Sequence, residues 1–255
     1  EIDLLVNDDT LSIANLLPHI NFIHIFSYQK KHDRRWVQEQ DIIKNIYRKY
    51  DLSINLTASD RSVIYALLAS KRSISAVEKD NKKSWWKKFL LNHHYFFDTN
   101  KHILLNNLQP LNLLKIKHNN IQSAPKISIN LINRIKRKID INGSNEFVIF
   151  HPSSQYRYKV YPENLRNELI FLLSKLNITV IVTGGDSEID REIKNSLPVL
   201  DNLINLIGQT SIEEYVALSN MSQCYIGMDT LNMHIAASQS KRIFAIFGPT
   251  NLRMW

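Results

Sequence analysis

The sequence predicts an α/β protein in which strands and helices alternate along most of the chain. In the first half, four short apolar runs predict strands, at residues 2–6, 22–26, 52–56 and 72–76. Three intervening stretches predict helices, at residues 11–15, 36–50 and 60–70. Strands that alternate with helices are typical of crossover units, so we expect a parallel sheet.

The alternation of predicted strands and helices is clearest after residue 146. Five apolar runs predict strands, at residues 147–150, 178–182, 203–206, 224–226 and 243–247. Helices are expected between them, at residues 162–176, from about residue 187, at 212–221 and at 230–238. Pro162 suits a first helical turn, and Thr210 or Ser211 suits a helix N-cap. This half therefore predicts a doubly wound parallel sheet.

The middle of the chain differs in composition. Residues 80–97 mix lysines with aromatic residues that include Trp85 and Trp86. Two interpretations stay open: a surface helix whose aromatic residues pack on the sheet, or a basic-aromatic patch that rests on an anionic membrane surface. Further helices are expected at residues 102–114 and 128–139, with a linker at 117–127.

Composition narrows the class of protein. The 255 residues carry a net charge of +8, which suits an anionic partner. No zinc spacing or RNP-like motif favours nucleic acid, and no apolar run is long enough for a transmembrane helix. The N-terminus does not resemble a signal peptide, and the single cysteine, Cys224, suits a buried apolar position. Together these features favour a cytoplasmic location.

Polar residues follow the predicted strands of the second half at their carboxyl ends, where open parallel sheets bind ligands. Dinucleotide and P-loop motifs are absent from the sequence. The turn at residues 227–234 remains, where the N–H groups of residues 230–232 and the helix dipole would attract a phosphate. The alternative is that Asp229 or Thr230 is only an N-cap and His234 a core histidine.

Several motifs of the second half, taken together, are specific. They are Asp-Thr-x-x-Met-His-Ile-Ala-Ala at 229–237, Ile-Phe-Ala-Ile-Phe-Gly-Pro-Thr at 243–250, His-Pro-Ser-Ser at 151–154, Lys-Val-Tyr-Pro at 159–162 and Thr-Gly-Gly-Asp-Ser-Glu at 183–188. The set resembles the lipopolysaccharide heptosyltransferases, glycosyltransferase family 9. The upstream sequence is similar to the branching, heptosyltransferase III type.

The resemblance implies a GT-B architecture of two Rossmann-like doubly wound domains that face across a cleft, at residues 1–120 and 121–255. It implies transfer of heptose from ADP-heptose, with inversion and without an essential metal or other cofactor. The acceptor would be an inner-core sugar of lipopolysaccharide or lipooligosaccharide. A basic protein of this kind is expected to contact the anionic inner membrane peripherally, and no nucleic-acid partner is expected.

The resemblance also assigns donor-binding residues. Lys159 matches the lysine that faces the donor phosphates, and Glu188 matches the acid that holds the ribose hydroxyls. The remaining donor-binding residues are expected at the strand ends: Ser153, Ser154, Gly184, Asp229, Thr230, Leu231 and His234.

Two departures from the family pattern are visible. Leu231 stands where the family usually has a small residue, which narrows the expected sugar pocket. The expected aspartate base belongs to a Gly-Asp turn that would lie upstream of residue 1, and the closing C-terminal segment would lie beyond residue 255. Asp8, Asp9 and Asp60 fit loop or cap positions better. A relative that uses another sugar nucleotide and a non-catalytic nucleotide-binding module therefore stay open as alternatives.

Overall fold

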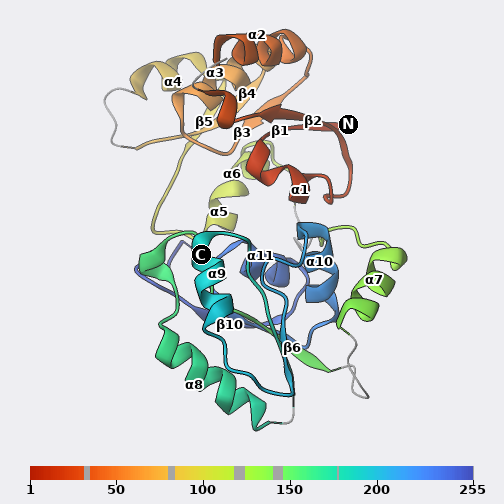
Figure 1. Cartoon of the computed structure of the whole chain (residues 1–255). Helices are drawn as coiled ribbons and strands as arrows, with labels where there is room; N and C mark the ends of the chain where they lie inside the picture. The colour runs from red at the N-terminus through yellow and green to blue at the C-terminus, as the bar shows by residue number, and fades with distance from the viewer. Residues whose placement is uncertain (32–34, 80–83, 118–123, 140–145, 177, 255) are drawn as a thin grey trace. The chain divides into compact units, whose positions relative to one another are not determined.

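The computed structural model of the chain describes residues 1–31, 35–79, 84–117, 124–139, 146–176 and 178–254. The chain forms two compact units (Figure 1). Unit 1 contains Gln122–Thr250 together with Glu1–Asp3 and Thr10–Ile23, and unit 2 contains Leu4–Asp9, His24–Ile121 and Asn251–Trp255. The domain division at residues 120 and 121 stays a prediction. Parts of the expected linker and of the lysine-rich segment, residues 118–123 and 80–83, lie outside the described residues.

Unit 1 is built on a five-stranded sheet in which every strand pair is parallel. Its strands are β6 (Phe147–His151), β7 (Thr179–Val182), β8 (Leu203–Asn205), β9 (Cys224–Met228) and β10 (Arg242–Ile246). The strand order is β10-β9-β6-β7-β8. The chain thus adds β7 and β8 on one side of β6 and then adds β9 and β10 on the other side. This reversal places a topological switch point between β6 and β9.

The side chains of β6 show why both faces of this sheet are covered. Phe147 and Ile149 join one apolar cluster, whereas Val148 and Phe150 join the other. Ile135 contributes to the first cluster and Ile170 to the second. The helices of this unit are α1 (Leu11–Ala14), α7 (Ile129–Ile139), α8 (Glu163–Ser174), α9 (Glu188–Asn195), α10 (Ile212–Met221) and α11 (Leu231–Ser238). The predicted doubly wound sheet is therefore confirmed.

Unit 2 carries a parallel sheet of β3 (Ser53–Asn55), β4 (Ser73–Val77) and β5 (His93–Phe96). Its helices are α2 (Arg35–Ile46), α3 (Asp60–Ala69), α4 (Trp85–Leu90), α5 (Ile103–Asn107) and α6 (Gln109–Leu113). Two further strands, β1 (Ile2–Asn7) and β2 (Ile20–Phe26), pair with each other in a separate sheet. The expectation of parallel pairing in the first half is confirmed for β3–β5, while among the described residues β1 and β2 do not join that sheet.

Three local predictions were wrong in detail. The helix expected at residues 102–114 is two helices, because Leu108 ends α5 and Pro110, which lacks an N–H donor, begins the next turn in α6. The helix expected to reach residue 50 ends at Ile46, and Arg48 then adopts a positive φ of 51°. Pro162 occupies the N-cap of α8, with an extended ψ of 139°, rather than its first turn.

The aromatic residues of the middle segment divide between core and surface. Trp86 packs against Val63 and Val77, and Tyr95 is buried on β5. Trp85 and Phe89 remain exposed. Trp86 and Tyr95 thus fit the interpretation in which the aromatic residues pack on the sheet, whereas Trp85 and Phe89 do not. No helix within the described ranges is both long and apolar enough to cross a bilayer.

Candidate functional site

A cavity of about 450 Å³ lies at the carboxyl end of the sheet of unit 1. Its walls come from the segments that follow β6, β7, β8 and β9, at the switch point where an open α/β sheet binds its ligand. The residues that line it are His151, Ser153–Tyr156, Lys159, Thr183–Gly185, Ser187, Asp190, Thr210–Ile212, Tyr215 and Asp229–Asn232.

The cavity collects most of the predicted donor-binding residues from separate strand ends, namely Ser153, Ser154, Lys159, Gly184, Asp229, Thr230 and Leu231. Glu188 and His234 are not part of the wall that the described residues form. Glu188 is the exposed first residue of α9. His234 lies one turn into α11, with its Nε2 3.7 Å from Asp229 Oδ1. Contact of these two residues with a donor stays a prediction.

A buried carboxylate, Asp190, organises one wall of the cavity. Its Oδ1 accepts a 2.5 Å hydrogen bond from Ser153 Oγ, and its Oδ2 accepts from the backbone N and the hydroxyl of Ser187. Burial acts to raise the pKa of Asp190, but the hydrogen bonds from Ser153, Ser187 and Gly185 outweigh it and lower the pKa. Sequence reasoning missed Asp190, although the Ser-x-x-Asp spacing from Ser187 is a capping-box signal.

Two glycines allow the close backbone approaches of this site. A side chain at Gly184 would place its Cβ 2.8 Å from Asp190 Oδ1. At Gly227, where φ is +154°, a Cβ would lie 2.3 Å from the carbonyl oxygen of His151. Neither position accepts a larger residue without displacement of its neighbour. Gly227 therefore allows the close approach of β9 to the end of β6, and Gly184 allows the approach of Asp190 to the end of β7.

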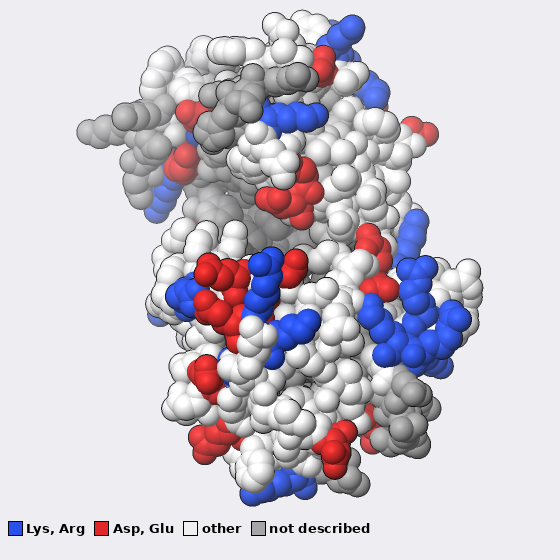
Figure 2. All heavy atoms as spheres, viewed as in Figure 1, with Lys and Arg blue, Asp and Glu red and all other residues white. Residues whose placement is uncertain are grey.

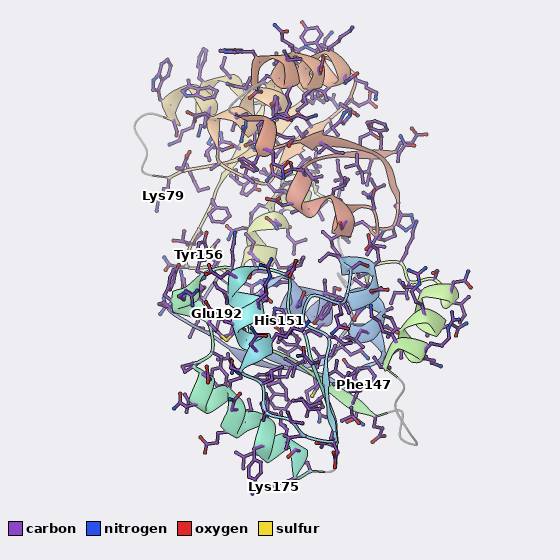
Figure 3. The ribbon with its side chains drawn as sticks, viewed as in Figure 1. Lys79, Phe147, His151, Tyr156, Lys175 and Glu192 are labelled. Atoms are coloured by element: carbon purple, nitrogen blue, oxygen red, sulfur yellow. The ribbon has the colours of Figure 1, made fainter. Side chains whose placement is uncertain are left out.

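His151, at the end of β6, lines the cavity and is labelled in Figure 3. Its Nδ1 lies 3.0 Å from Thr183 Oγ1 and 2.9 Å from Asn232 Nδ2. An amide nitrogen only donates, so Nδ1 is the acceptor and the ring is neutral. Burial lowers the pKa of His151 to about 4, against a smaller opposing effect of Asp190. His151 thus ties α11, through Asn232, to the central strand.

The first turn of α11 differs from those of the two neighbouring helices. α9 and α10 each have a complete capping box, made by Ser187 with Asp190 and by Ser211 with Glu214. Thr230, the N-cap of α11, has a buried Oγ1 and makes no side-chain cap hydrogen bond to the first turn of the helix. Since the first N–H groups of a helix have no partner within it, α11 offers uncapped donors to an anion.

Lys159 supplies a cation to the same cavity. It ends the short 3-10 helix η4 (Arg157–Lys159), and its backbone and side chain pack against Gly248, which follows β10. Within the described parts of the chain, Lys159 forms no ion pair with an acidic side chain. Its charge is therefore available to an anionic ligand.

Two tyrosines stand at this edge of the site. The rings of Tyr156 and Tyr158 stack, with centroids 5.6 Å apart and an interplanar angle of 21°, and both side chains are exposed. Between them, Arg157 pairs through both terminal nitrogens with Glu192 of α9. Figure 3 shows Tyr156 and Glu192 at this end of unit 1. The ion pair between Arg157 and Glu192 was not predicted, because no local sequence motif indicates it.

Comparison with known proteins identifies the family of this chain. The sequence matches glycosyltransferase family 9 (heptosyltransferase) over residues 40–255. The chain belongs to this family. It is therefore a glycosyltransferase, and the resemblance seen in its motifs is confirmed.

Relatives of this family 9 chain extend the match to its whole length. Lipopolysaccharide heptosyltransferase 3 of Escherichia coli is 24% identical, over 100% of this chain and 76% of the relative. A family 9 structure from Veillonella parvula superposes with a TM-score of 0.83 at 17% identity, over 100% of this chain and 74% of that one. An E. coli heptosyltransferase solved with ADP-2-deoxy-2-fluoro heptose has a TM-score of 0.70 at 13% identity, over 98% and 90% of the two chains. The fold is thus that of the GT-B heptosyltransferases.

The family also directs attention to carboxylates that could act as a base. Asp8 and Asp9 lie in the 3-10 helix η1 (Asp8–Thr10), where Asp8 Oδ1 accepts from the backbone N–H of Asp9. Asp60 begins α3, and its Oδ1 lies 2.8 Å from Lys87 Nζ. Asp8 and Asp9 lie in a short 3-10 helix, and Asp60 is the first residue of α3, one position after its N-cap Ser59, rather than the loop or cap residues expected from the sequence. In the described part of this family 9 chain, no group of three or more His, Cys, Asp or Glu residues could hold a metal ion.

Proposed function

We propose that this protein transfers heptose from ADP-heptose to an inner-core sugar of lipopolysaccharide or lipooligosaccharide. The observation that carries the proposal is the cavity at the switch point, where the uncapped first turn of α11 and Lys159 converge. A helix N-terminus and an available cation together are suited to a diphosphate. The relatives named above, one of which was solved with an ADP-heptose analogue, support the choice of nucleotide and sugar.

The chemistry of this arrangement favours departure of ADP. As the bond between the anomeric carbon and the diphosphate oxygen breaks, negative charge grows on the departing ADP. Lys159 and the N–H groups of Leu231 and Asn232 would stabilise that charge more strongly in the transition state than in the ground state. Because these groups stabilise the charge on the diphosphate, we propose that transfer needs no metal ion.

The acceptor hydroxyl would attack the anomeric carbon from the face opposite the departing diphosphate, which inverts the configuration at that carbon. A general base removes the hydroxyl proton, and the family resemblance expects this base to be the aspartate of a Gly-Asp turn. Asp229 carries a negative charge and would be repelled by the diphosphate. We therefore assign it to the sugar hydroxyls, from which a carboxylate accepts hydrogen bonds.

We further propose that the protein works at the cytoplasmic side of the inner membrane, in peripheral contact with it. The net charge of +8 suits an anionic surface and a phosphorylated glycolipid. Part of this charge gathers on α7, which carries Arg134, Lys136, Arg137 and Lys138, although Arg134 and Lys138 pair with Glu214 (Figure 2).

Nucleotide binding tests the donor. ADP at about 100 times its dissociation constant should stabilise the protein by about 2.7 kcal/mol in thermal unfolding, whereas UDP and GDP should have little effect. A stronger effect of UDP or GDP would instead indicate a relative that uses another sugar nucleotide.

A transfer assay tests the reaction. The complete protein should transfer heptose from ADP-heptose to a heptose-containing core acceptor, at the same rate with and without EDTA. Loss of activity in EDTA would contradict the metal-free reaction. ADP binding without transfer would favour the non-catalytic nucleotide-binding alternative.

A further inference from the structure

Helix α4 exposes its largest apolar side chains to solvent. Of its six residues, Trp85 is 69% exposed, Phe89 is 81% exposed and Leu90 is 53% exposed. Trp85 and Phe89 are four positions apart and therefore lie on one face of the helix. Trp and Phe are residues that a soluble fold ordinarily buries or half-buries.

The opposite side of α4 buries a charge. The Lys87 side chain is only 1% exposed, and its Nζ lies 2.8 Å from Asp60 Oδ1 and 3.0 Å from Glu78 Oε2. It also donates to the carbonyl oxygen of Ala58. Burial alone would lower the pKa of Lys87, but the hydrogen bonds to Asp60 and Glu78 keep it raised, so the side chain stays charged.

Hydrophobic burial alone would favour the reverse orientation, with Trp85 and Phe89 inside and Lys87 in water. The polar contacts of Lys87, at the carboxyl end of β4 and at the start of α3, hold the helix in the observed orientation. Trp86 packs into the core beside Leu91 and further stabilises this orientation of α4. The outward position of the aromatic pair is therefore built into the fold rather than being a loose helix end.

A cation belongs to the same surface. Lys88 Nζ lies 5.0 Å from the ring centroid of Phe96, a half-exposed residue of β5. Lys88 lies three positions after Trp85 and next to Phe89 in the helix, so its charge belongs to the face of α4 that exposes these aromatic residues. We call Trp85, Lys88, Phe89, Leu90 and Phe96 the α4 surface.

We infer that the α4 surface docks onto the interfacial layer of an anionic phospholipid bilayer. This inference rests on the peripheral membrane contact proposed above and names the residues that make it. Aromatic side chains partition into the interfacial layer, and lysine is attracted to anionic headgroups. A second copy of the chain fits less well, because a two-fold contact would bring Lys88 toward its own symmetry mate.

Vesicle sedimentation with the full chain tests the inference. The wild-type protein should bind vesicles that contain phosphatidylglycerol and bind phosphatidylcholine vesicles much more weakly. The double variant Trp85→Ala, Phe89→Ala should bind the anionic vesicles about tenfold more weakly, because the inserted apolar area is lost. Lys88→Gln should weaken binding about fivefold, the expected contribution of one lysine at such a surface.

A matched control is available on α8. Phe171 is also exposed, and Lys175 Nζ lies 4.4 Å from its ring centroid, but within the described residues Phe171 forms no ring contact with a second aromatic side chain. Phe171→Ala should leave vesicle binding unchanged. An equal loss in Phe171→Ala, or wild-type binding by the double variant, would overturn the assignment to α4. Circular dichroism establishes that each variant is folded.

Two other outcomes separate this inference from neighbouring ones. Self-association that the double variant abolishes, in a protein that binds no vesicles, would show that the α4 surface is a contact between copies and would overturn the inference. Vesicle binding that depends on α4 in a protein that transfers no heptose would support the surface while contradicting the proposed reaction.

Discussion

Ser153 Oγ donates a 2.5 Å hydrogen bond to Asp190 Oδ1, which joins the end of β6 to the first turn of α9 across the wall of the cavity. The hydroxyl proton of Ser153 is therefore already used in a hydrogen bond within the protein. Ser154, the next residue, remains as a hydroxyl at the cavity. Of the two serines that the sequence singled out, Ser153 positions the wall, and Ser154 is the one that we expect to donate to a phosphate.

Replacement of Asp190 tests this positioning role. Asp190→Asn removes the charge that accepts hydrogen bonds from Ser153 and Ser187 and places an amide group near their donors. Each charge-assisted hydrogen bond contributes about 1.5–3 kcal/mol, so the free energy of unfolding should fall by about that amount or more. Urea unfolding measures it. Asp186→Asn is the control, because Asp186 is exposed and should leave stability near the wild-type value. An equal loss in both variants would contradict the buried role of Asp190.

His151 should make stability depend on pH. Its pKa is lowered by burial to about 4 in the folded protein, below the ordinary value of 6.5. The unfolded chain therefore binds the proton more readily, and stability decreases as the pH falls from about 6.5 toward 4, by roughly 3 kcal/mol in all. Thermal unfolding across this range measures the decrease.

His151→Gln should flatten that pH dependence, because glutamine does not titrate. The comparison is His93→Gln, which changes an exposed histidine of β5 and should retain the wild-type slope. An unchanged slope in His151→Gln would assign the acid sensitivity to other groups.

The sheets were predictable where burial leaves a continuous apolar run. The strand at residues 147–151 is buried on both faces and was found within one residue. β5, with the sequence His-His-Tyr-Phe, was missed because its apolar residues form no such run. The break between α5 and α6 was missed because Leu108 closes one helix and opens the next without a change in apolar pattern.

The site was predictable to the extent that strand ends define it. The rule for open parallel sheets predicts from the sequence that Lys159 and Thr230 lie near one another, and both line the cavity. It could not find Asp190, whose partner Ser153 is 37 positions away in the sequence, or the contact between His151 and Asn232. Such roles depend on which side chains meet in the folded protein.

Leu231 should restrict the donor sugar. It lines the cavity at the first turn of α11 and is 42% exposed. Leu231→Ala enlarges the space there, so kcat/KM should rise for donors with bulkier sugars relative to ADP-heptose, by about tenfold or more. Initial-rate kinetics with two nucleotide sugars measure the ratio. Leu165→Ala, at an equally exposed position of α8, should leave the ratio unchanged. A ratio unaffected by Leu231→Ala would remove Leu231 from the sugar pocket.

Lys159 should act on departure of ADP. Because its charge meets no acidic partner in the described part of the chain, Lys159→Ala should leave stability largely intact but reduce transfer. Loss of one contact to developing negative charge raises a barrier by about 2.7–4 kcal/mol, or about 100- to 1,000-fold in kcat. ADP affinity should fall by much less, since this contact strengthens as the bond breaks. Lys175→Ala, on α8, controls for net charge. Equal kcat in Lys159→Ala and wild type would show that the charge on the departing diphosphate is stabilised by α11 without this lysine.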